Sequence, residues 1–365
     1  TPFLYATRRH IMELLIKNAN VFGELKDILL KDGKIEKISN RLKSENVFDA
    51  NGSKVFPGLI DIHTHGCGGA DVMEGKASYI SKILKSHGTT SFCPTTMTMP
   101  KSDIKRICSN IPDTADGAHF LGYHIEGPFV SREKCGAQNT DYLSAPDIDW
   151  YNSLENTALV VIAPELENSE EFIKKCKTKV AVGHTAADYG TALNAFNSGA
   201  DCVTHTFNAM PEPHHRGKTL LDAAFEKKAY VQLISDGFHV SRLMVNFLFK
   251  VFTSDRVILI SDSLAATGSD DGEYLFGGQK ITVKDKRAYT PDGHIAGSTS
   301  FLLDCVKKAI EFGIDEKDAF SAASKTPAEY LGIKKGKIEE GYDADLIITD
   351  YNYNLLKVIT SEDTR

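Results

Sequence analysis

A chain of 365 residues, with 42% hydrophobic and 25% charged residues, can bury a large core, so its composition excludes general disorder. The length exceeds one average domain but does not suffice for three large ones. The net charge of -7 gives no electrostatic reason to expect a nucleic-acid partner, and an anionic substrate would need local cationic groups.

The cysteines and the apolar runs indicate in which cellular compartment the protein is expected. Seven cysteines are scattered along the chain without a CxxC pair, which is typical of reduced thiols rather than of a disulfide framework. No apolar run approaches the roughly 18 residues of a transmembrane helix, and the first residues show no signal-peptide pattern. We therefore expect a cytoplasmic protein without a membrane partner.

Both ends of the chain show patterns of short strands. Between residues 12 and 56, apolar runs alternate with turn signals, and Lys31-Asp32-Gly33-Lys34 is a hairpin signal. Near the C-terminus, the strand candidates are Gly336–Ile338, Ala344–Ile348 and Leu355–Ile359. Neither end alone has enough strands for a stable sheet. We therefore predict one small β-sandwich domain from residues 1–54 and 329–365, with two unrelated β extensions as the alternative.

The middle of the chain alternates between strand and helix patterns. Helical spacing occurs in segments such as Ala77–His87, Glu170–Lys175 and Asp188–Ser198. The predicted strands are Val55–His63, Thr90–Pro94, Phe120–Glu126, Ala158–Pro164, Lys179–His184, Asp201–Thr206, Tyr230–Ser235 and Arg256–Ser261. Eight strands alternating with helical segments predict an α/β fold, a (β/α)8 TIM-like barrel over residues 55–328.

Polar side chains fall at the ends of these strands. In chain order they are His63 and His65, Glu126, His184, His205, His239 and Asp262. The C-terminal ends of barrel strands converge on one face, where active sites lie. The sequence therefore predicts that these distant residues form one site.

His63 and His65 lie two apart in an extended segment, so their side chains point to the same face and could hold one metal ion. An isolated pair of this kind can equally be two core histidines, but further ligand-type residues end other strands. His184 and His205 are predicted to be a second nitrogen pair, and Glu126 a carboxylate that binds one ion or bridges two. Nitrogen and oxygen ligands without cysteine favour one or two divalent ions, Zn or Fe first, with Mn or Co as alternatives.

Asp262 is predicted to be the catalytic residue. An ionised carboxylate beside a metal-bound water can take the proton of that water and return it to the leaving group. The alternative is a helix N-cap, since Asp262-Ser263 begins a loop after a strand.

Longer motifs then point to a family. They are Pro57–Gly66, Gly122–Phe129, Val182–Thr185, Thr204–Met210, Ile234–His239, Ser261-Asp262 and Ile295–Ser298. Together with the order HxH, Glu, His, His and Asp, they resemble the amidohydrolase superfamily and, within it, the N-acetylglucosamine-6-phosphate deacetylase family. The resemblance runs from about residue 12 to 350, and its most specific parts are Glu-Gly-Pro-Phe and His-Thr-Phe-Asn-Ala-Met.

The resemblance implies roles for individual residues. Glu126, His184 and His205 would be the principal metal ligands, with His63 and His65 completing a second metal position, and Asp262 would be the general base and acid. Substrate contacts would come from Ala137, Gln138, Asn208, Ala209, Arg216, His239, Ile295, Ala296 and Gly297. A homodimer is also implied, with Arg216 and His239 reaching across its interface.

Two local features bear on the sugar phosphate. Arg216 lies in a basic cluster, His214-His215-Arg216, of the kind that a phosphate requires, although an exposed polar loop is the alternative. Gln138 stands where the family commonly has a histidine that touches the sugar. A glutamine can hydrogen bond but carries no charge, which puts the identity of the sugar in doubt.

The reaction implied is the removal of acetate from N-acetylglucosamine 6-phosphate, which gives glucosamine 6-phosphate in amino-sugar catabolism. Two alternatives stay open. One is an amidohydrolase that acts on a related N-acyl sugar phosphate, such as N-acetylgalactosamine 6-phosphate. The other is an inactive barrel that serves as a scaffold, although such proteins usually lose ligands that this chain retains.

Overall fold

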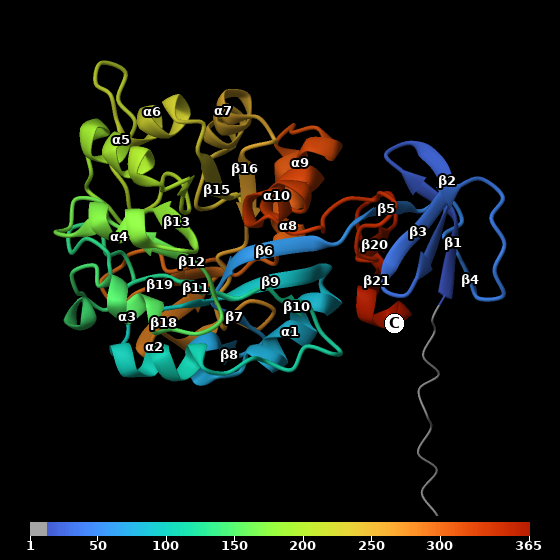
Figure 1. The fold of residues 1–365 in the computed structure, drawn as a ribbon, viewed down its shortest axis with the longest axis horizontal. Coiled ribbons are helices and arrows are strands. Elements are labelled where there is room, and N and C mark those ends of the chain that lie inside the picture. The colour runs from blue at the N-terminus through green and yellow to red at the C-terminus, as the bar shows by residue number, and fades with distance from the viewer. Residues whose placement is uncertain (1–12) are drawn as a thin grey trace, which may run out of the picture. The chain divides into compact units, whose positions relative to one another are not determined.

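The computed structural model describes residues 13–365 and divides into two compact units, whose elements are labelled in Figure 1. The smaller unit extends to Gly58 and resumes at Lys334–Arg365, and the larger unit is Leu59–Ile333. Residues 1–12 of the predicted small domain lie outside the described residues. Within residues 13–365, no helix is long and apolar enough to cross a membrane.

The small unit contains one hydrogen-bonded sheet, in which the described strands follow the order β21-β20-β5-β1-β2-β3, and β4 pairs with β1. The side chains of Ile35 on β3 and Ile359 on β21 belong to the same buried core although their strands lie at opposite ends of this order. The sheet therefore folds over its own core, as a β-sandwich does. The strands are β1 (Glu13–Val21), β2 (Glu24–Lys31), β3 (Lys34–Ser39), β4 (Val47–Asp49), β5 (Lys54–Pro57), β20 (Leu346–Thr349) and β21 (Leu355–Ile359).

The predicted hairpin is confirmed, because Lys31 pairs with Lys34 across the turn. Asp32 and Gly33 have φ of 48° and 74°, which is the left-handed conformation that a two-residue hairpin turn requires. The predicted strand Gly336–Ile338 is wrong, since this segment forms no strand. Gly336 has a φ of 76°, so the backbone turns there instead of extending.

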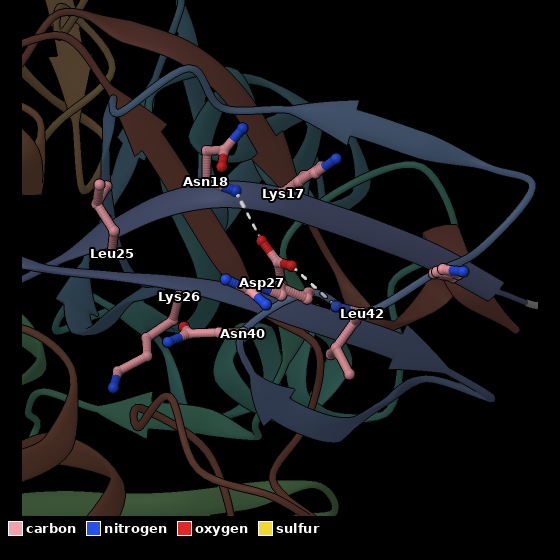
Figure 2. Close-up of a pocket in the computed structure, with 9 residues that line it drawn as sticks. Lys17, Asn18, Leu25, Lys26, Asp27, Asn40 and Leu42 are labelled. Atoms are coloured by element: carbon pink, nitrogen blue, oxygen red, sulfur yellow. Dashed lines mark hydrogen bonds between the residues drawn. The ribbon is translucent and has the colours of Figure 1, made fainter.

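A surface pocket of the small unit surrounds Asp27 (Figure 2). Its buried carboxylate accepts hydrogen bonds from the backbone N–H groups of Asn18 and Leu42, each at 3.0 Å. The carboxylate thus fixes the segment after β3 onto β1. None of the predicted site residues lines this pocket.

The large unit confirms the predicted barrel (Figure 1). Its parallel strands follow the order β6-β9-β11-β12-β13-β14-β15-β16 within the described residues, and β10 pairs with β9. Thr64 of the first strand and Ser263, which follows the last strand, form a parallel bridge between the two ends of this order. The strands are β6 (Leu59–Thr64), β9 (Thr89–Thr96), β10 (His119–Phe120), β11 (Tyr123–Ile125), β12 (Thr157–Ile162), β13 (Lys179–Val182), β14 (Cys202–Val203), β15 (Tyr230–Ile234) and β16 (Val257–Ile260).

Two predicted strands of the barrel are each divided in the structure, and the predicted strand Asp201–Thr206 is shortened to Cys202–Val203. Val55–His63 is divided between β5 and β6: the N–H of Gly58 donates to Asp345 in the small unit, while that of Leu59 donates to Gly88 in the large one. Phe120–Glu126 is divided at Gly122, whose φ of 109° interrupts the extended backbone. In both segments the apolar pattern is continuous in sequence, although the strand that it predicts is interrupted in the structure.

The helices follow the predicted alternation. The three predicted helical segments correspond to α1, α4 and α5, and Asp188 caps α5 through the N–H of Thr191. The helices are α1 (Ala77–Ser86), α2 (Lys101–Cys108), α3 (Ile148–Asn152), α4 (Ser169–Lys175), α5 (Tyr189–Ser198), α6 (Leu220–Glu226), α7 (Arg242–Phe252), α8 (Leu302–Glu311), α9 (Glu316–Ala322) and α10 (Lys325–Leu331). Short strands β7 (Gly66–Cys67) and β8 (Ala70–Asp71) form a hairpin after β6.

A separate antiparallel sheet follows β16 and was not predicted. It consists of β17 (Gly272–Phe276), β18 (Gln279–Lys284) and β19 (Arg287–Tyr289). Phe276 pairs with Gln279, so Gly277 and Gly278 form the turn between β17 and β18. We call the segment Phe276–Gln279 the hairpin tip.

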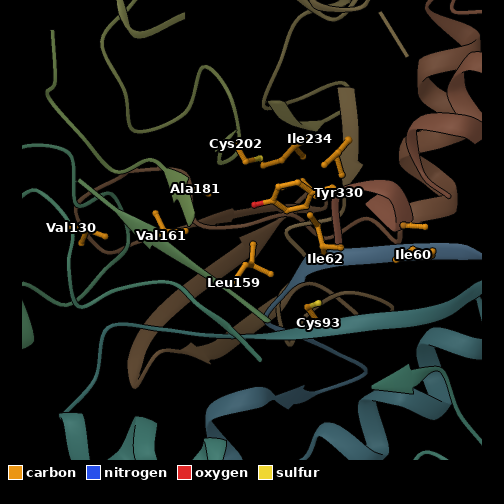
Figure 3. Packing of buried hydrophobic residues seen from close by; sticks show 13 residues of the cluster. Ile60, Ile62, Cys93, Val130, Leu159, Val161, Ala181, Cys202, Ile234 and Tyr330 are labelled. Carbon is orange, nitrogen blue, oxygen red and sulfur yellow. The ribbon is translucent and has the colours of Figure 1, made fainter. Parts of the chain in front are cut away.

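Buried apolar side chains from the barrel strands support the polar strand ends. Figure 3 shows Tyr330 of α10 among these side chains, which include Ile62 of β6 and Ile234 of β15. Ile62 is fully buried and directly precedes His63. Close packing at this position restricts the backbone that presents the polar side chains.

Candidate metal centre and active site

Six of the predicted residues come together at one place. Within the described part of the chain, two triplets could hold a metal ion: His63, His65 and Asp262, and Glu126, His184 and His205. The ligand atoms of each triplet lie within 4.8 Å of one another, and all six residues are buried. The residues follow or end strands β6, β11, β13, β14 and β16, so the barrel assembles them from positions up to 199 residues apart in sequence.

The spacing of the nitrogen atoms fits metal coordination. The Nε2 atoms of His63 and His65 are 3.3 Å apart, and those of His184 and His205 are 3.0 Å apart. Tetrahedral ligands about 2.0–2.1 Å from an ion are separated by about 3.3 Å. The donor set of nitrogen and oxygen atoms suits Zn, Fe, Mn or Co.

The hydrogen bonds of two rings leave Nε2 available as a ligand. The Nδ1 atom of His63 lies 3.0 Å from the amide oxygen of Gln232, and that of His184 lies 2.9 Å from the carbonyl oxygen of Lys134. Both oxygens are acceptors, so each Nδ1 carries the proton and each Nε2 keeps its lone pair. These contacts fix the tautomer that metal binding needs.

Glu126 connects the two triplets. Its Oε1 lies 3.2 Å from the Nε2 of His63, 3.3 Å from that of His184 and 3.1 Å from that of His205. Its Oε2 lies 3.3 Å from the Nε2 of His65. This carboxylate is placed to serve both metal positions.

The charges of the centre favour a cation. Burial lowers the pKa of His65, but hydrogen bonds and charges of Asp262 and Glu126 outweigh burial and raise this pKa to about 10. Burial raises the pKa of Glu126, but the surrounding imidazoles hold it well below its usual range. The two carboxylates that attract protons to these rings also attract a metal ion, which displaces such protons when it binds.

Asp262 faces the triplets from the end of β16. Its Oδ1 lies 3.3 Å from the Nε2 atoms of both His63 and His65. Its N–H donates to the carbonyl of His63 at 2.9 Å, and its own carbonyl accepts from Ser298 at 2.7 Å, which holds the residue at a φ of 48°. No helix begins here within residues 13–365, so the alternative of a helix N-cap is wrong.

A cavity of about 790 Å³ opens onto the centre, a volume that suits a small ligand. Asp262, Glu126, His65, His184 and His205 line it. So do most of the predicted substrate contacts, namely Ala137, Gln138, Asn208, Ala209, His239, Ile295 and Gly297. Ala296 is fully buried and does not line the cavity, and its N–H donates to the carbonyl of Ala288 at 3.0 Å.

Of the two substrate contacts predicted to reach across a dimer interface, His239 lines the cavity of its own chain and Arg216 does not. Arg216 lies in an exposed loop and does not line the cavity of its own chain. His239 does line that cavity, and its side chain is only 5% exposed. His239 therefore belongs to the cavity of its own chain, and its reach across a subunit interface stays a prediction.

His239 forms a buried pair with Asp236, with 2.7 Å between Nδ1 and Oδ2. Burial lowers the pKa of His239, but the hydrogen bond and charge of Asp236 outweigh burial and raise it. The charged ring thus stabilises the fold below pH 6.5, its ordinary pKa, and this contribution is lost as pH rises through the folded pKa. A charged ring also suits an anionic substrate.

We expect Asp236→Asn to lower the pKa of His239, because burial then acts without an opposing carboxylate. An NMR titration of the imidazole in the wild type and the variant measures the two values. His239→Gln identifies the resonance. An unchanged pKa in Asp236→Asn would show that the cavity, not Asp236, sets the charge of this ring.

Gln138 lies closer to the metal ligands than the sequence indicates. Its amide oxygen accepts from the N–H of Thr98 at 2.7 Å, and this contact fixes the orientation of the amide. Its Nε2 donates to the Oε2 of Glu126 at 2.7 Å. Gln138 thus supplies a neutral donor that holds the Glu126 carboxylate.

Several residues of the site were not predicted from the sequence. Met97 and Phe276 line the cavity, and the Phe276 ring lies 5.1 Å from the His65 ring in an edge-to-face arrangement. Lys134 to Gly136 also line it. The Gly277-Gly278 pair between β-forming segments was a hairpin signal that could have located Phe276; no comparable signal marks Met97.

Comparison with known proteins agrees with this geometry. The model of the amidohydrolase family matches residues 55–364. The N-acetylglucosamine-6-phosphate deacetylase of Bacillus subtilis is 33% identical over 95% of both chains, and that of Homo sapiens is 30% identical over 89% of this chain and 87% of its own.

Solved structures agree as well. The N-acetylglucosamine-6-phosphate deacetylase of Thermotoga maritima has a TM-score of 0.87 and 29% identity, covering 95% of this chain and 98% of its own. A mutant of the Mycobacterium smegmatis enzyme, in complex with N-acetyl-D-glucosamine-6-phosphate, has a TM-score of 0.88 and 26% identity, covering 96% and 98%. The chain therefore belongs to the amidohydrolase family of metal-dependent hydrolases, in the group of the N-acetylglucosamine-6-phosphate deacetylases.

Proposed function

We propose that this enzyme removes the acetyl group of N-acetylglucosamine 6-phosphate and releases acetate and glucosamine 6-phosphate in amino-sugar catabolism. The observation that carries the proposal is the position of Asp262, whose carboxylate lies 3.3 Å from two ligand nitrogens and lines the cavity. The names of the relatives supply the substrate. The seven cysteines form no disulfide within residues 13–365, which supports a cytoplasmic location.

The centre is proposed to hold two divalent ions, Zn or Fe. His184 and His205 would hold one and His63 and His65 the other, and Glu126 would contribute to both positions. When bound, such ions acidify water towards neutral pH and polarise a carbonyl oxygen. Metal analysis of the purified protein tests the number. A stoichiometry near two supports the shared carboxylate, and a stoichiometry of one leaves His63 and His65 with a structural role.

Asp262 supplies the proton transfers. Burial raises its pKa, but the neighbouring histidines outweigh burial and lower it, so the carboxylate is ionised and can accept a proton from the attacking water. An amide nitrogen leaves poorly as an anion, so the same carboxyl then protonates the departing amine. Because Asp262 lines the cavity beside the ligands, one side chain serves both steps.

An acetate-release assay with N-acetylglucosamine 6-phosphate and N-acetylgalactosamine 6-phosphate tests the function. N-acetylglucosamine 6-phosphate is expected to be cleaved with the highest kcat/KM. A higher kcat/KM for N-acetylgalactosamine 6-phosphate would change the assigned sugar, while the proposed deacetylation reaction would stand. Absence of acetate from all N-acetyl sugar phosphates, with metal bound, would overturn the proposed reaction.

Arg216 is proposed to bind the phosphate within a homodimer, because it carries a cation on an exposed loop outside the cavity of its own chain. We expect Arg216→Ala to raise KM for the phosphorylated sugar by roughly 10- to 100-fold, since a charge-assisted contact contributes about 1.5–3 kcal/mol. The KM for N-acetylglucosamine without phosphate should hardly change. Lys218→Ala, which removes a neighbouring exposed cation, is the matched control.

Equal effects of Arg216→Ala on the two sugars would remove the phosphate role. Sedimentation of the wild-type protein tests the dimer separately. A monomer with full activity would contradict an Arg216 contact between subunits.

A further inference from the structure

Two large apolar side chains form a closed corner of the cavity beside the metal ligands. Met97 and Phe276 both line the cavity, yet their exposed fractions are only 1% and 3%. The other apolar residues that line it are small or more exposed: Ala137, Phe207, Ala209 and Ile295. We call the Met97 and Phe276 side chains the apolar corner.

The apolar corner adjoins one triplet directly through Phe276 and is connected to the other through Gln138. The ring of Phe276 lies 5.1 Å from that of His65, and the two planes are at 87°. The Sδ atom of Met97 lies 3.6 Å from the Nε2 of Gln138, which in turn donates to Glu126. The corner is therefore in direct reach of a group that reacts at the centre.

The hairpin tip gives the corner its fixed shape. Gly277 and Gly278 have φ of 54° and 79°, and a Cβ added at Gly277 would lie 2.9 Å from the Cβ of Met97. The Nε2 of Gln279 donates to the carbonyl of Ala137 at 3.3 Å, which ties the tip to another wall of the cavity. Met97 thus packs against backbone that cannot easily move away.

The reacting carbon of an N-acetyl group carries three substituents. The carbonyl oxygen needs a cation or a donor, the nitrogen leads to the sugar, and the methyl group alone prefers an apolar surface. Near the ligands, the buried apolar surface is that of Met97 and Phe276, whereas half-buried Phe207 adjoins Asn208, a predicted sugar contact.

We propose that Met97 and Phe276 receive the methyl group of the substrate and set the limit on acyl-chain length. This inference rests on the proposed deacetylation. A buried corner that accommodates a methyl group has little room for another methylene, because packing around it is already close. The enzyme should therefore discriminate acetyl from propionyl and butyryl groups.

The test uses Met97→Ala in the metal-loaded enzyme. We expect the ratio of kcat/KM for N-propionyl to that for N-acetylglucosamine 6-phosphate to rise at least about tenfold, the scale on which one methylene is discriminated. Met99→Ala is the matched control: Met99 packs 3.7 Å from the Cβ position of Gly278 at the same hairpin tip but does not line the cavity. The ratio in this control should equal that of the wild type.

The outcomes separate the two proposals. If the wild type releases acetate but Met97→Ala leaves the ratio unchanged, the apolar corner does not hold the methyl group. If Phe207→Ala raises the ratio instead, the methyl group lies against Phe207 and the inference is overturned. If the wild type releases no acetate, the proposed reaction fails before the corner is tested. Phe276→Leu, which keeps an apolar side chain over His65, should give a smaller rise than Met97→Ala.

Discussion

Asp262→Asn is expected to lower kcat for acetate release by about 10³-fold while the protein keeps its metal, because general acid–base catalysis contributes on this scale. Asparagine preserves the size of the side chain and its oxygen acceptor but takes up no proton. The ligand nitrogens of His63 and His65 and the shared Glu126 stay in place. Single-turnover acetate release and metal analysis of the same preparation measure both effects.

Asp255→Asn is the control for this variant. Asp255 precedes β16, whereas Asp262 follows it, and Asp255 makes a 2.8 Å ion pair with Lys325 far from any ligand of the centre. Residues at that end of a barrel strand affect stability rather than catalysis. Near-normal turnover by Asp262→Asn, with metal bound, would show that another group moves the proton.

Glu126→Gln is expected to empty both metal positions and to abolish activity. The carboxylate lies within 3.3 Å of four imidazole nitrogens, so its charge contributes to both triplets. The substitution removes that charge, and the amide can place only one acceptor oxygen among the four rings. We expect metal content to fall below one ion per chain and kcat/KM to fall by more than about 10³-fold.

The comparison with Asp262→Asn makes this result specific. Both variants remove one negative charge from the same centre, but only Glu126→Gln should lose metal. Because bound metal stabilises the folded state, the melting temperature of Glu126→Gln should no longer respond to added metal or to a chelator. Retention of two ions by Glu126→Gln would mean that the histidines suffice and that the carboxylate does not bridge.

The sequence predicts the centre well because its polar residues stand at the ends of apolar strands. His184 and His205 each follow a buried strand by two residues, and the barrel brings all such ends to one face. The cavity walls are less predictable. Met97 is one more apolar residue after β9, and only the tertiary fold places it against the hairpin tip.

Pairing partners were also hidden from the sequence. The run from Val55 to His63 is uniformly suited to a strand, yet its first part pairs with β20 and its second with β9. Gln138 was expected near the sugar, and its contact with Glu126 depends on the Thr98 backbone, which lies 40 residues earlier. Local patterns specify elements, whereas long-range contacts specify what each element touches.

The pairing of β5 with β20 has a consequence for synthesis on the ribosome. Roughly 290 residues separate the two strands, and at about 5–20 residues per second they take on the order of 15–60 s to translate. Throughout that interval one edge of β5 has no β20 to pair with, so the nascent chain carries an open edge that can associate with other chains. The small sheet is completed only after the entire barrel has emerged. Chaperone protection of the open edge of β5 can therefore end only once β20 has been translated.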